Sequence, residues 1–220
     1  MAGGAPSRPP PARRGRGGRV NRDGGGARQA VFLDRDGTVS REVGYMTDPE
    51  RLELLPRSAE AIAALNRSGL MAILATNQSG VARGLFPRRS VDSAHARLRR
   101  LLARRGAWLD AIYFCPHHPL EGRAPWRLRC LCRKPRPGML RRAAQEHGLD
   151  LPRCYVVGDT RKDVHLAHAV GATPILVLTG YGRGEWERHR SGFRRAPAHL
   201  AFDLRDAVGW ILDHEGRGPG

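Results

Sequence analysis

The chain has 220 residues, of which 38 are basic and 21 acidic, so its formal charge is 38 − 21 = +17. Hydrophobic residues make up 40% of the chain, which is enough for the core of one domain and excludes disorder of the whole chain. The sequence contains no run of the roughly 18 apolar residues that a membrane span requires and no apolar segment of the secretory kind. We therefore expect a cytoplasmic protein that does not contact a membrane.

The positive charge is almost entirely arginine, because Lys134 and Lys162 are the only lysines. Codon usage produces such a bias without selection for nucleic acid, and only 6% of the residues are aromatic. We therefore expect no nucleic-acid partner and no salt-dependent retention of DNA or RNA. Gly, Pro and Arg dominate residues 1–28, which we expect to form a disordered basic tail before a single domain of residues 29–215.

Short apolar runs alternate with helical periodicity from residue 29 onward. Strands are expected over residues 30–33, 70–74, 111–114, 154–157 and 174–178. Helices are expected over residues 58–67, 90–105, 138–147, 162–170 and 204–213, and residues 181–198 are expected to be an arginine-rich connector of uncertain order. Continuously apolar strands are typical of a parallel sheet that is covered on both faces. The alternation therefore predicts a doubly wound, Rossmann-like α/β domain whose ligands gather at the carboxyl ends of its strands.

Two aspartates directly follow the first predicted strand. Asp34 and Asp36 are two residues apart, so the side-chain period of a strand would turn them the same way and Arg35 the other way. Two carboxylates about 4 Å apart repel by about 4 kcal/mol at an effective dielectric of about 20. Such a pair indicates a shared proton or a shared cation, and oxygen ligands suit a hard ion such as Mg²⁺. The alternative is an ordinary Asp-Gly turn.

Polar side chains that suit a phosphate or a cation also follow the next three predicted strands. They are Thr76, Asn77, Gln78 and Ser79 after the second strand, Arg133 and Lys134 after the third, and Asp159, Thr160 and Asp163 after the fourth. Hydroxyl and amide groups bind phosphate oxygens, and a lysine acts as a compact positive charge. Each cluster alone is compatible with a loop, whereas clusters at four successive strand ends indicate one site.

Three cysteines and two histidines lie between the third predicted strand and Arg133. They are Cys115, His117, His118, Cys130 and Cys132. Three thiolates and an imidazole form a closed tetrahedral zinc site, which is structural because no ligand position is open. The spacing leaves open which histidine faces the metal, and whether the cysteines are simply reduced thiols. The fourth cysteine, Cys154, lies within a predicted strand and is expected to be buried.

The polar clusters resemble, in the same order, the motifs of the haloacid dehalogenase superfamily of phosphotransferases over residues 29–180. The resemblance implies that Asp34 is the nucleophile that takes up the phosphoryl group, and that Asp36 is the general acid and then the base. It implies phosphate contacts from Thr76 and Lys134. The Mg²⁺ ligands that it implies are Asp34, the backbone carbonyl of Asp36 and Asp159, with Asp163 in support.

The cysteine loop, residues 115–132, narrows the resemblance. The Cys-Pro-His and Cys-x-Cys pairs and the Arg-Lys-Pro segment that follows are similar to the D-glycero-D-manno-heptose 1,7-bisphosphate 7-phosphatases and the related histidinol-phosphate phosphatases. Residues 44–45, 76–84 and 179–182 also match the heptose branch. The zinc ligands implied by this group are Cys115, His117, Cys130 and Cys132.

The motif spacing leaves no room for a large cap domain, because 76 − 34 = 42 residues separate the first two motifs and 134 − 76 = 58 separate the next two. Loops must then shape the site and contact the substrate. In addition to the phosphate-binding clusters, the expected substrate-binding residues are Glu42, Val43, Gly44 and Tyr45. Arg133 is available for a second phosphate. The basic tail and the arginines of the cysteine loop depart from the family pattern.

The resemblance implies a monomeric, Mg²⁺-dependent phosphatase with structural Zn²⁺. It would remove the 7-phosphate of heptose 1,7-bisphosphate through an aspartyl-phosphate, on the route to a nucleotide-activated heptose. Three alternatives stay open: a histidinol-phosphate phosphatase, a polynucleotide 3′-phosphatase, and a basic zinc module that binds nucleic acid and uses its aspartates only structurally. The cysteine loop argues against the polynucleotide phosphatase.

Overall fold

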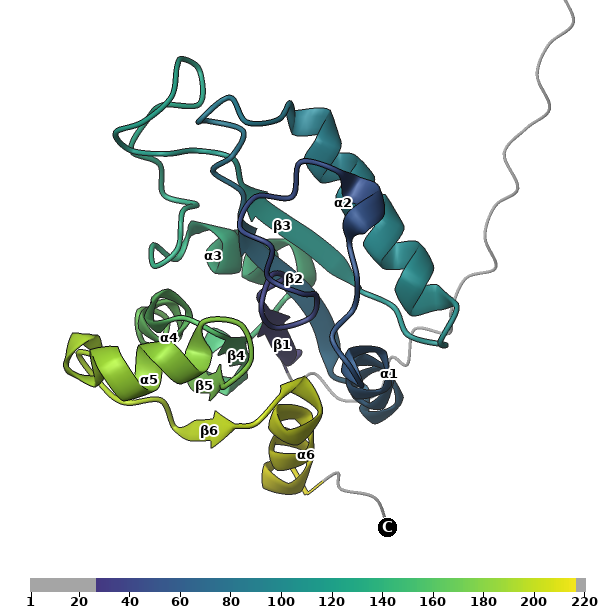
Figure 1. The fold of residues 1–220 in the computed structure, drawn as a ribbon. Coiled ribbons are helices and arrows are strands. Elements are labelled where there is room, and N and C mark those ends of the chain that lie inside the picture. Colours follow the sequence, from purple (N-terminus) through teal and green to yellow (C-terminus); the bar gives the residue numbers. More distant parts are fainter. Residues whose placement is uncertain (1–26, 217–220) are drawn as a thin grey trace, which may run out of the picture.

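A single parallel sheet organises the computed structural model, which describes residues 27–216. The strands lie in the order β3-β2-β1-β4-β5-β6, and Figure 1 shows them twisting through the centre of the molecule. They are β1 (Ala30–Leu33), β2 (Met71–Asn77), β3 (Ala111–Cys115), β4 (Tyr155–Gly158), β5 (Thr173–Val177) and β6 (His199–Ala201). The order reverses between β1 and β4, so the predicted doubly wound α/β fold is confirmed. The predicted tail lies outside the described residues, apart from its last two positions.

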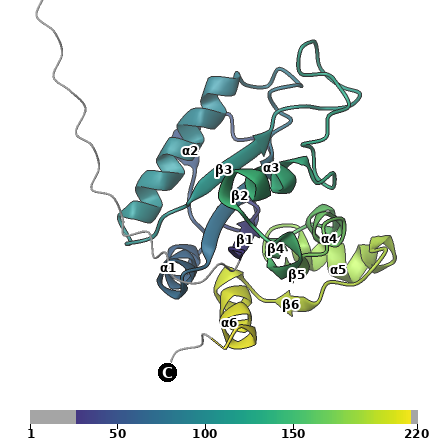
Figure 2. The ribbon, with the colours of Figure 1, turned by 180° about the vertical axis from the view of Figure 1, so that it is seen from behind.

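Helices cover both faces of the sheet, as the alternation of the sequence predicts. One face packs against α1 (Ser58–Ser68), α2 (Arg88–Ala103) and α6 (Leu204–His214), and the other against α3 (Gly138–His147) and α4 (Arg161–His168). Figures 1 and 2 show these two layers from opposite sides. In β1, Val31 and Leu33 point into the first core and Phe32 into the second, because successive strand residues face opposite ways. Both faces are therefore apolar, which explains the continuous hydrophobic runs.

The prediction of an arginine-rich connector over residues 181–198 is incomplete, and the sixth strand that follows this segment was not predicted. This segment contains α5 (Gly182–His189) and the short helix η3 (Arg190–Gly192), and β6 follows it at the edge of the sheet. In α5 only Gly182 is buried, so the segment lacks the apolar stripe by which a surface helix is found. β6 has three residues, which is too short for a pattern of period two.

Long loops gather beyond the carboxyl ends of β1, β2 and β3, at the top of the view in Figure 1. Between β1 and β2 the chain forms only the short helix η1 (Pro49–Arg51) and α1, and between β2 and Lys134 only α2, β3 and the cysteine loop. A further short helix, η2 (Leu151–Arg153), precedes β4. Residues 27–216 thus contain no large cap domain over this edge. None of the helices in that range is long and apolar enough to cross a membrane.

Candidate active site

Three carboxylates meet at the carboxyl edge of the sheet. Asp34 follows β1, Asp159 follows β4, and Asp163 lies in the first turn of α4. One oxygen atom of each lies within 4.8 Å of the other two, and Asp159 and Asp163 are both 1% exposed. Ionised carboxylates at such separations repel one another, so this acidic cluster requires positive charge. Its oxygen donors fit a hard divalent cation.

Lys134 supplies one positive charge from the loop before α3. Its Nζ lies 2.9 Å from Asp34 Oδ1 and 2.6 Å from Asp163 Oδ1, and it donates a 2.9 Å hydrogen bond to the Ala75 carbonyl oxygen. Burial opposes the charged form, but the carboxylates of Asp163 and Asp34 outweigh it and raise the pKa of Lys134. The side chain is therefore an ammonium fixed beside Asp34.

The acidic cluster favours protonated carboxyl groups as long as no metal is bound. Burial is the largest effect on Asp34 and raises its pKa to about 6, although Lys134 pulls in the opposite direction. Burial, followed by the charges of Asp34 and Asp163, raises the pKa of Asp159 to about 8. A bound cation would reverse both shifts, because it stabilises the ionised form of each ligand.

Backbone geometry holds Asp159 in place. Gly37 has a φ of +80°, and a Cβ atom at this position would overlap the Asp159 carboxylate. The Tyr181 N–H donates a 2.9 Å hydrogen bond to Asp159 Oδ2, and the Thr179 hydroxyl donates to the Gly37 carbonyl oxygen at 2.6 Å. The loops after β1 and β5 thus close around one carboxylate, and glycine at position 37 is required by both conformation and space.

Asp36 has a different set of partners from Asp34. Arg35 Nε donates to Asp36 Oδ1 at 2.9 Å and Arg35 Nη2 to Asp36 Oδ2 at 2.7 Å, while Gln78 Nε2 donates to Asp36 Oδ2 at 3.0 Å. Asp34 and Asp36 both line the cavity described below, whereas Arg35 is buried and does not line it, as expected; the contact of the Arg35 side chain with Asp36 was not predicted. β1 ends at Leu33, so strand alternation no longer applies to residues 34–36.

A polar cavity of about 320 Å³ lies over the acidic cluster. The predicted site residues that line it are Asp34, Asp36, Glu42, Gly44, Tyr45, Thr76, Asn77, Gln78, Ser79, Arg133, Lys134, Asp159 and Thr160. Two predicted residues do not line it: Asp163 lies buried beneath it in contact with Lys134, and Val43 is 45% exposed. The folded chain thus brings most of the predicted positions to one cavity.

Three of these polar side chains are occupied by contacts within the protein. Asn77 fixes the Lys134 segment, donating from Nδ2 to the Lys134 carbonyl oxygen at 3.3 Å and accepting from its N–H at 3.0 Å. The Thr160 hydroxyl donates to Asp163 Oδ2 at 2.7 Å and caps α4. The Gln78 amide donates to the Thr76 hydroxyl at 3.0 Å as well as to Asp36. These groups position their neighbours, whether or not they also reach a substrate.

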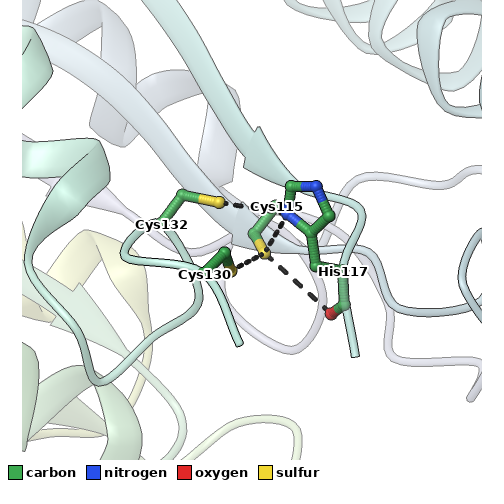
Figure 3. Close-up of side chains that lie close together, drawn as sticks. All are labelled: Cys115, His117, Cys130 and Cys132. Atoms are coloured by element: carbon green, nitrogen blue, oxygen red, sulfur yellow. Dashed lines mark hydrogen bonds between the residues drawn. The ribbon is translucent and has the colours of Figure 1, made fainter. Parts of the chain in front are cut away.

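A second ligand cluster lies in the cysteine loop. Sγ atoms of Cys115, Cys130 and Cys132 and a ring nitrogen of His117 all lie within 4.8 Å of one another. Figure 3 shows these four side chains gathered together. His117 Nδ1 is 3.3 Å from Cys132 Sγ and 3.6 Å from Cys115 Sγ. The hydrogen bond from Cys115 lowers the pKa of Cys132 to about 5, which favours the thiolate that metals bind. This donor set fits a closed zinc site.

His118, the rival ligand, points elsewhere. Its Nδ1 accepts hydrogen bonds from the Leu120 and Glu121 N–H groups at 3.3 and 2.9 Å, and its Nε2 lies 3.3 Å from Arg83 Nη2. The structure therefore brings His117, and not His118, to the cysteines. Cys154 is fully buried and lies apart from the cluster, as expected.

The cysteine loop is attached to the wall of the cavity. Arg83 of the β2–α2 loop pairs with Glu121, the Ala82 N–H donates to the Pro116 carbonyl oxygen at 3.2 Å, and Arg133 Nη1 donates to the His117 carbonyl oxygen at 3.1 Å. Arg83 and Arg133 both line the cavity. A metal in the cysteine cluster would thus fix two arginines at the mouth of the site.

Comparison with known proteins decides the family. A HAD-hydrolase-like family model matches residues 131–207. The D-glycero-D-manno-heptose-1,7-bisphosphate 7-phosphatase of Thermosynechococcus vestitus is 45% identical over 197 residues, which cover 85% of this chain and 97% of that protein. The chain belongs to the heptose-bisphosphate phosphatase family. The corresponding enzyme of Pseudomonas putida is 42% identical over 72% of this chain and 87% of its own length.

A solved member of the heptose-bisphosphate phosphatase family shares the fold. The crystal structure of the D,D-heptose 1,7-bisphosphate phosphatase from B. bronchiseptica, complexed with magnesium and phosphate, superposes with a TM-score of 0.74 at 36% identity. It covers 85% of this chain and 99% of that one. The predicted superfamily, the phosphatase class and the heptose branch are thereby confirmed.

Further residues line or support the cavity without having been assigned an individual role from the sequence. Arg83, Tyr181 and Lys162 line it, and Arg35 is buried beneath it with 1% exposure. The sequence could have identified Lys162 as a candidate site residue, since it is one of two lysines in an arginine-rich chain. Nothing in the sequence identified Arg35, because a charged residue is almost never expected to be fully buried.

Proposed function

We propose that this chain is a Mg²⁺-dependent phosphatase that hydrolyses the 7-phosphate of D-glycero-D-manno-heptose 1,7-bisphosphate and leaves heptose 1-phosphate. The observation that carries the substrate is the 45% identity to a named heptose phosphatase over 97% of that protein's length. The cavity supports a doubly phosphorylated substrate. Its lining combines Asp34, Asp159 and Lys134 with three further cationic side chains, Arg83, Arg133 and Lys162, so a second anion would also meet positive charge.

Asp34 is the proposed nucleophile. Its carboxylate attacks the phosphorus of the substrate, the bond from phosphorus to the leaving oxygen breaks, and an aspartyl-phosphate forms. This divides one difficult displacement into two easier ones. A phosphate monoester is anionic and repels the attacking carboxylate, so positive charge must be in place first. The Lys134 ammonium, 2.9 Å from Asp34 Oδ1, would supply it from within the chain, and Thr76, which lines the cavity, is the proposed hydroxyl donor to a phosphate oxygen.

Asp36 is the proposed general acid and base. It donates a proton to the oxygen of the leaving sugar as that oxygen separates from phosphorus. It then accepts a proton from the water that attacks the aspartyl-phosphate, which restores the Asp34 carboxylate and releases inorganic phosphate. Asp36 lies outside the group of carboxylates that could share a metal. A side chain that is not a metal ligand stays available for proton transfer.

The donor atoms fit two different metals. Mg²⁺ would be held by carboxylate oxygens of Asp34 and Asp159 and by the Asp36 backbone carbonyl, with Asp163 in support. When bound, it would supply charge neutralisation at the transferring phosphoryl group. Zn²⁺ would be held by Cys115, His117, Cys130 and Cys132 and would hold the loop in shape. The B. bronchiseptica relative, complexed with magnesium and phosphate, supports the first assignment.

The test is a comparison of kcat/KM for heptose 1,7-bisphosphate, histidinol phosphate and a 3′-phosphorylated oligonucleotide, with and without Mg²⁺. We expect the heptose bisphosphate to be preferred, with heptose 1-phosphate identified as the product by ³¹P NMR. A preference for either other substrate would overturn the assignment of the sugar and leave the chemistry at Asp34 intact. The monomeric state, the cytoplasmic location and the absence of a nucleic-acid partner stay predictions.

A further inference from the structure

The fully buried Arg35 forms a hydrogen-bonded ion pair with Asp36, the proposed acid-base residue. Arg35 is 1% exposed, and its guanidinium makes two hydrogen bonds to the two carboxylate oxygens of Asp36, at 2.9 and 2.7 Å. This fork-on-carboxylate geometry restricts both the position and the rotation of the carboxylate plane. A lysine, with a single charged nitrogen on a flexible stem, could not do the same.

Gln78 and Ser40 also contact the Asp36 carboxylate. The Gln78 amide accepts from Arg35 Nη2 at 3.0 Å and donates to Asp36 Oδ2 at 3.0 Å. The Ser40 hydroxyl lies 3.4 Å from Asp36 Oδ1. Because Gln78 also donates to the Thr76 hydroxyl at 3.0 Å, the network links the carboxylate of Asp36 to the residue proposed to hold the phosphate. We call Arg35, Gln78 and Ser40 the Asp36 clamp.

Stability is a poor explanation for a buried arginine here. Arg35 Nη1 is buried with no hydrogen-bond partner among the described residues. Burying a charged pair often costs as much as the pair returns, and apolar replacements of such pairs are often neutral or stabilising.

We propose that Arg35, braced by Gln78, is a positioning residue that fixes the Asp36 carboxylate for proton transfer to the leaving sugar oxygen. This inference rests on the proposed function. Asp36 remains the group that touches the reacting atoms, and Arg35 acts through it from beneath the cavity. In the first half-reaction the carboxyl proton of Asp36 goes to the leaving oxygen, and the resulting carboxylate has both oxygens within reach of the Arg35 fork.

The experiment compares a substrate whose leaving group must be protonated with a substrate whose leaving group departs as an anion. A sugar alkoxide must be protonated as it leaves, whereas 4-nitrophenolate leaves without a proton. The parameter kcat/KM for each substrate reports the steps up to release of that group. A residue that only supports the fold would change kcat/KM for both substrates by the same factor, whereas a residue that positions the acid would affect mainly the sugar phosphate.

For Arg35→Met, which keeps length and removes the fork, we expect kcat/KM for heptose 1,7-bisphosphate to fall by roughly 10²-fold or more and kcat/KM for 4-nitrophenyl phosphate by less than about fivefold. Arg35→Lys should recover part of the loss with the sugar. The matched control is Arg41→Met, which alters an exposed arginine paired with Glu53 and should leave both values unchanged.

Two further variants keep the outcome clear. If Arg35→Met does not fold, as judged by its circular dichroism, Gln78→Leu removes one donor to Asp36 and should show the same selectivity, with a loss of roughly tenfold on the sugar phosphate. Asp36→Asn tests the proposed function itself. If Asp36→Asn shows the leaving-group selectivity and the clamp variants lose activity equally on both substrates, the positioning role is wrong. If Asp36→Asn lacks the selectivity too, the acid-base role of Asp36 fails.

Discussion

The two clusters that could hold a metal are similar in size but opposite in setting. In each, the ligand atoms lie within 4.8 Å of one another. The acidic cluster lies at the ends of central strands and has protein partners for its oxygens, among them Lys134 and the Tyr181 N–H. The Cys/His cluster joins the end of β3 to a loop, and its sulfur and nitrogen atoms contact mainly one another.

This difference in setting predicts different roles for the two clusters, the acidic cluster in the reaction and the Cys/His cluster in the shape of a loop. Strand ends and the first turn of α4 position the acidic cluster, so we expect a cation there to serve the reaction more than the shape of the site. The residues between Cys115 and Cys132 form no helix or strand, so we expect the loop to depend on its ligands as well as on its contacts with the cavity wall for its path. We therefore expect changes in the acidic cluster to act on turnover, and changes in the Cys/His cluster to act on loop order and substrate affinity.

Asp34→Asn should have the largest effect. Asparagine preserves the shape of the side chain but removes the nucleophile, so kcat should fall by at least roughly 10³-fold. The measurement is phosphate release at saturating substrate and Mg²⁺. Asp92→Asn, at an exposed position of α2, is the matched control and should keep full activity. An Asp34→Asn variant that retained a tenth of the rate would remove the covalent mechanism and leave the fold assignment untouched.

Lys134→Met should have the next largest effect, with a kcat/KM roughly 10²-fold lower than that of the wild type. The substitution leaves the carboxylates of Asp34 and Asp163 without the ammonium that both contact, so the metal-free variant should also lose about 3 kcal/mol of unfolding free energy. The other lysine gives the comparison. Lys162 is exposed and lines the cavity, so Lys162→Met should change KM more than stability. Equal effects of the two substitutions on urea unfolding would contradict the structural role of Lys134.

Asp159→Asn tests the electrostatics of the acidic cluster through pH. Its raised pKa, about 8 in the fold against 3.8 for a free aspartate, means that the folded protein binds a proton that the unfolded chain has released. Stability from this group is therefore present below about pH 4 and is lost as the pH rises to about 8.

In EDTA, Asp159→Asn should therefore match wild type near pH 4 and exceed it near pH 8, by an amount on the order of a few kcal/mol. Urea unfolding at several pH values measures this difference. Mg²⁺ should reverse the order at pH 8, because it binds the ionised carboxylate of the wild type only. A difference that did not change with pH would show that Asp159 titrates normally in the folded protein.

The acidic cluster could be predicted from the sequence, because in a parallel sheet the carboxyl ends of all strands meet at one edge. Asp34 and Asp159 follow strands, Thr76 lies at the carboxyl end of β2, and Lys134 lies in a loop at that edge, and apolar runs mark those strands. The sequence could not distinguish His117 from His118, since adjacent loop residues have no periodicity to orient them. The contact between Arg35 and Asp36 could not be predicted, because strand alternation ends with β1 at Leu33 and does not describe how neighbouring side chains meet in the loop that follows.

Cys132→Ser should act on the loop. We expect the variant to lose its bound zinc, measured by inductively coupled plasma mass spectrometry, and trypsin to cleave faster after Arg123, Arg127 or Arg129. Its KM for the heptose bisphosphate should rise roughly tenfold with little change in kcat, because the loop holds Arg133 through the His117 carbonyl. Cys154→Ser, a buried cysteine outside the cluster, should keep zinc and KM. Loss of kcat alone in Cys132→Ser would mean that the two clusters are not separate in function.

The smallest effect should come from Glu121→Gln, at the contact between the cysteine loop and the cavity wall. Glu121 pairs with Arg83, but the two side chains are 52% and 29% exposed, so the pair contributes less than about 1 kcal/mol to stability. Its removal frees the Arg83 charge for the substrate, so KM should fall by less than about threefold at low ionic strength, and the difference should vanish near about 0.5 M salt. Glu53→Gln, in an exposed pair away from the cavity, is the control. If KM rose instead, Glu121 would be holding Arg83 in the orientation that binds substrate, and the loop would contribute to recognition through this pair as well as through Arg133.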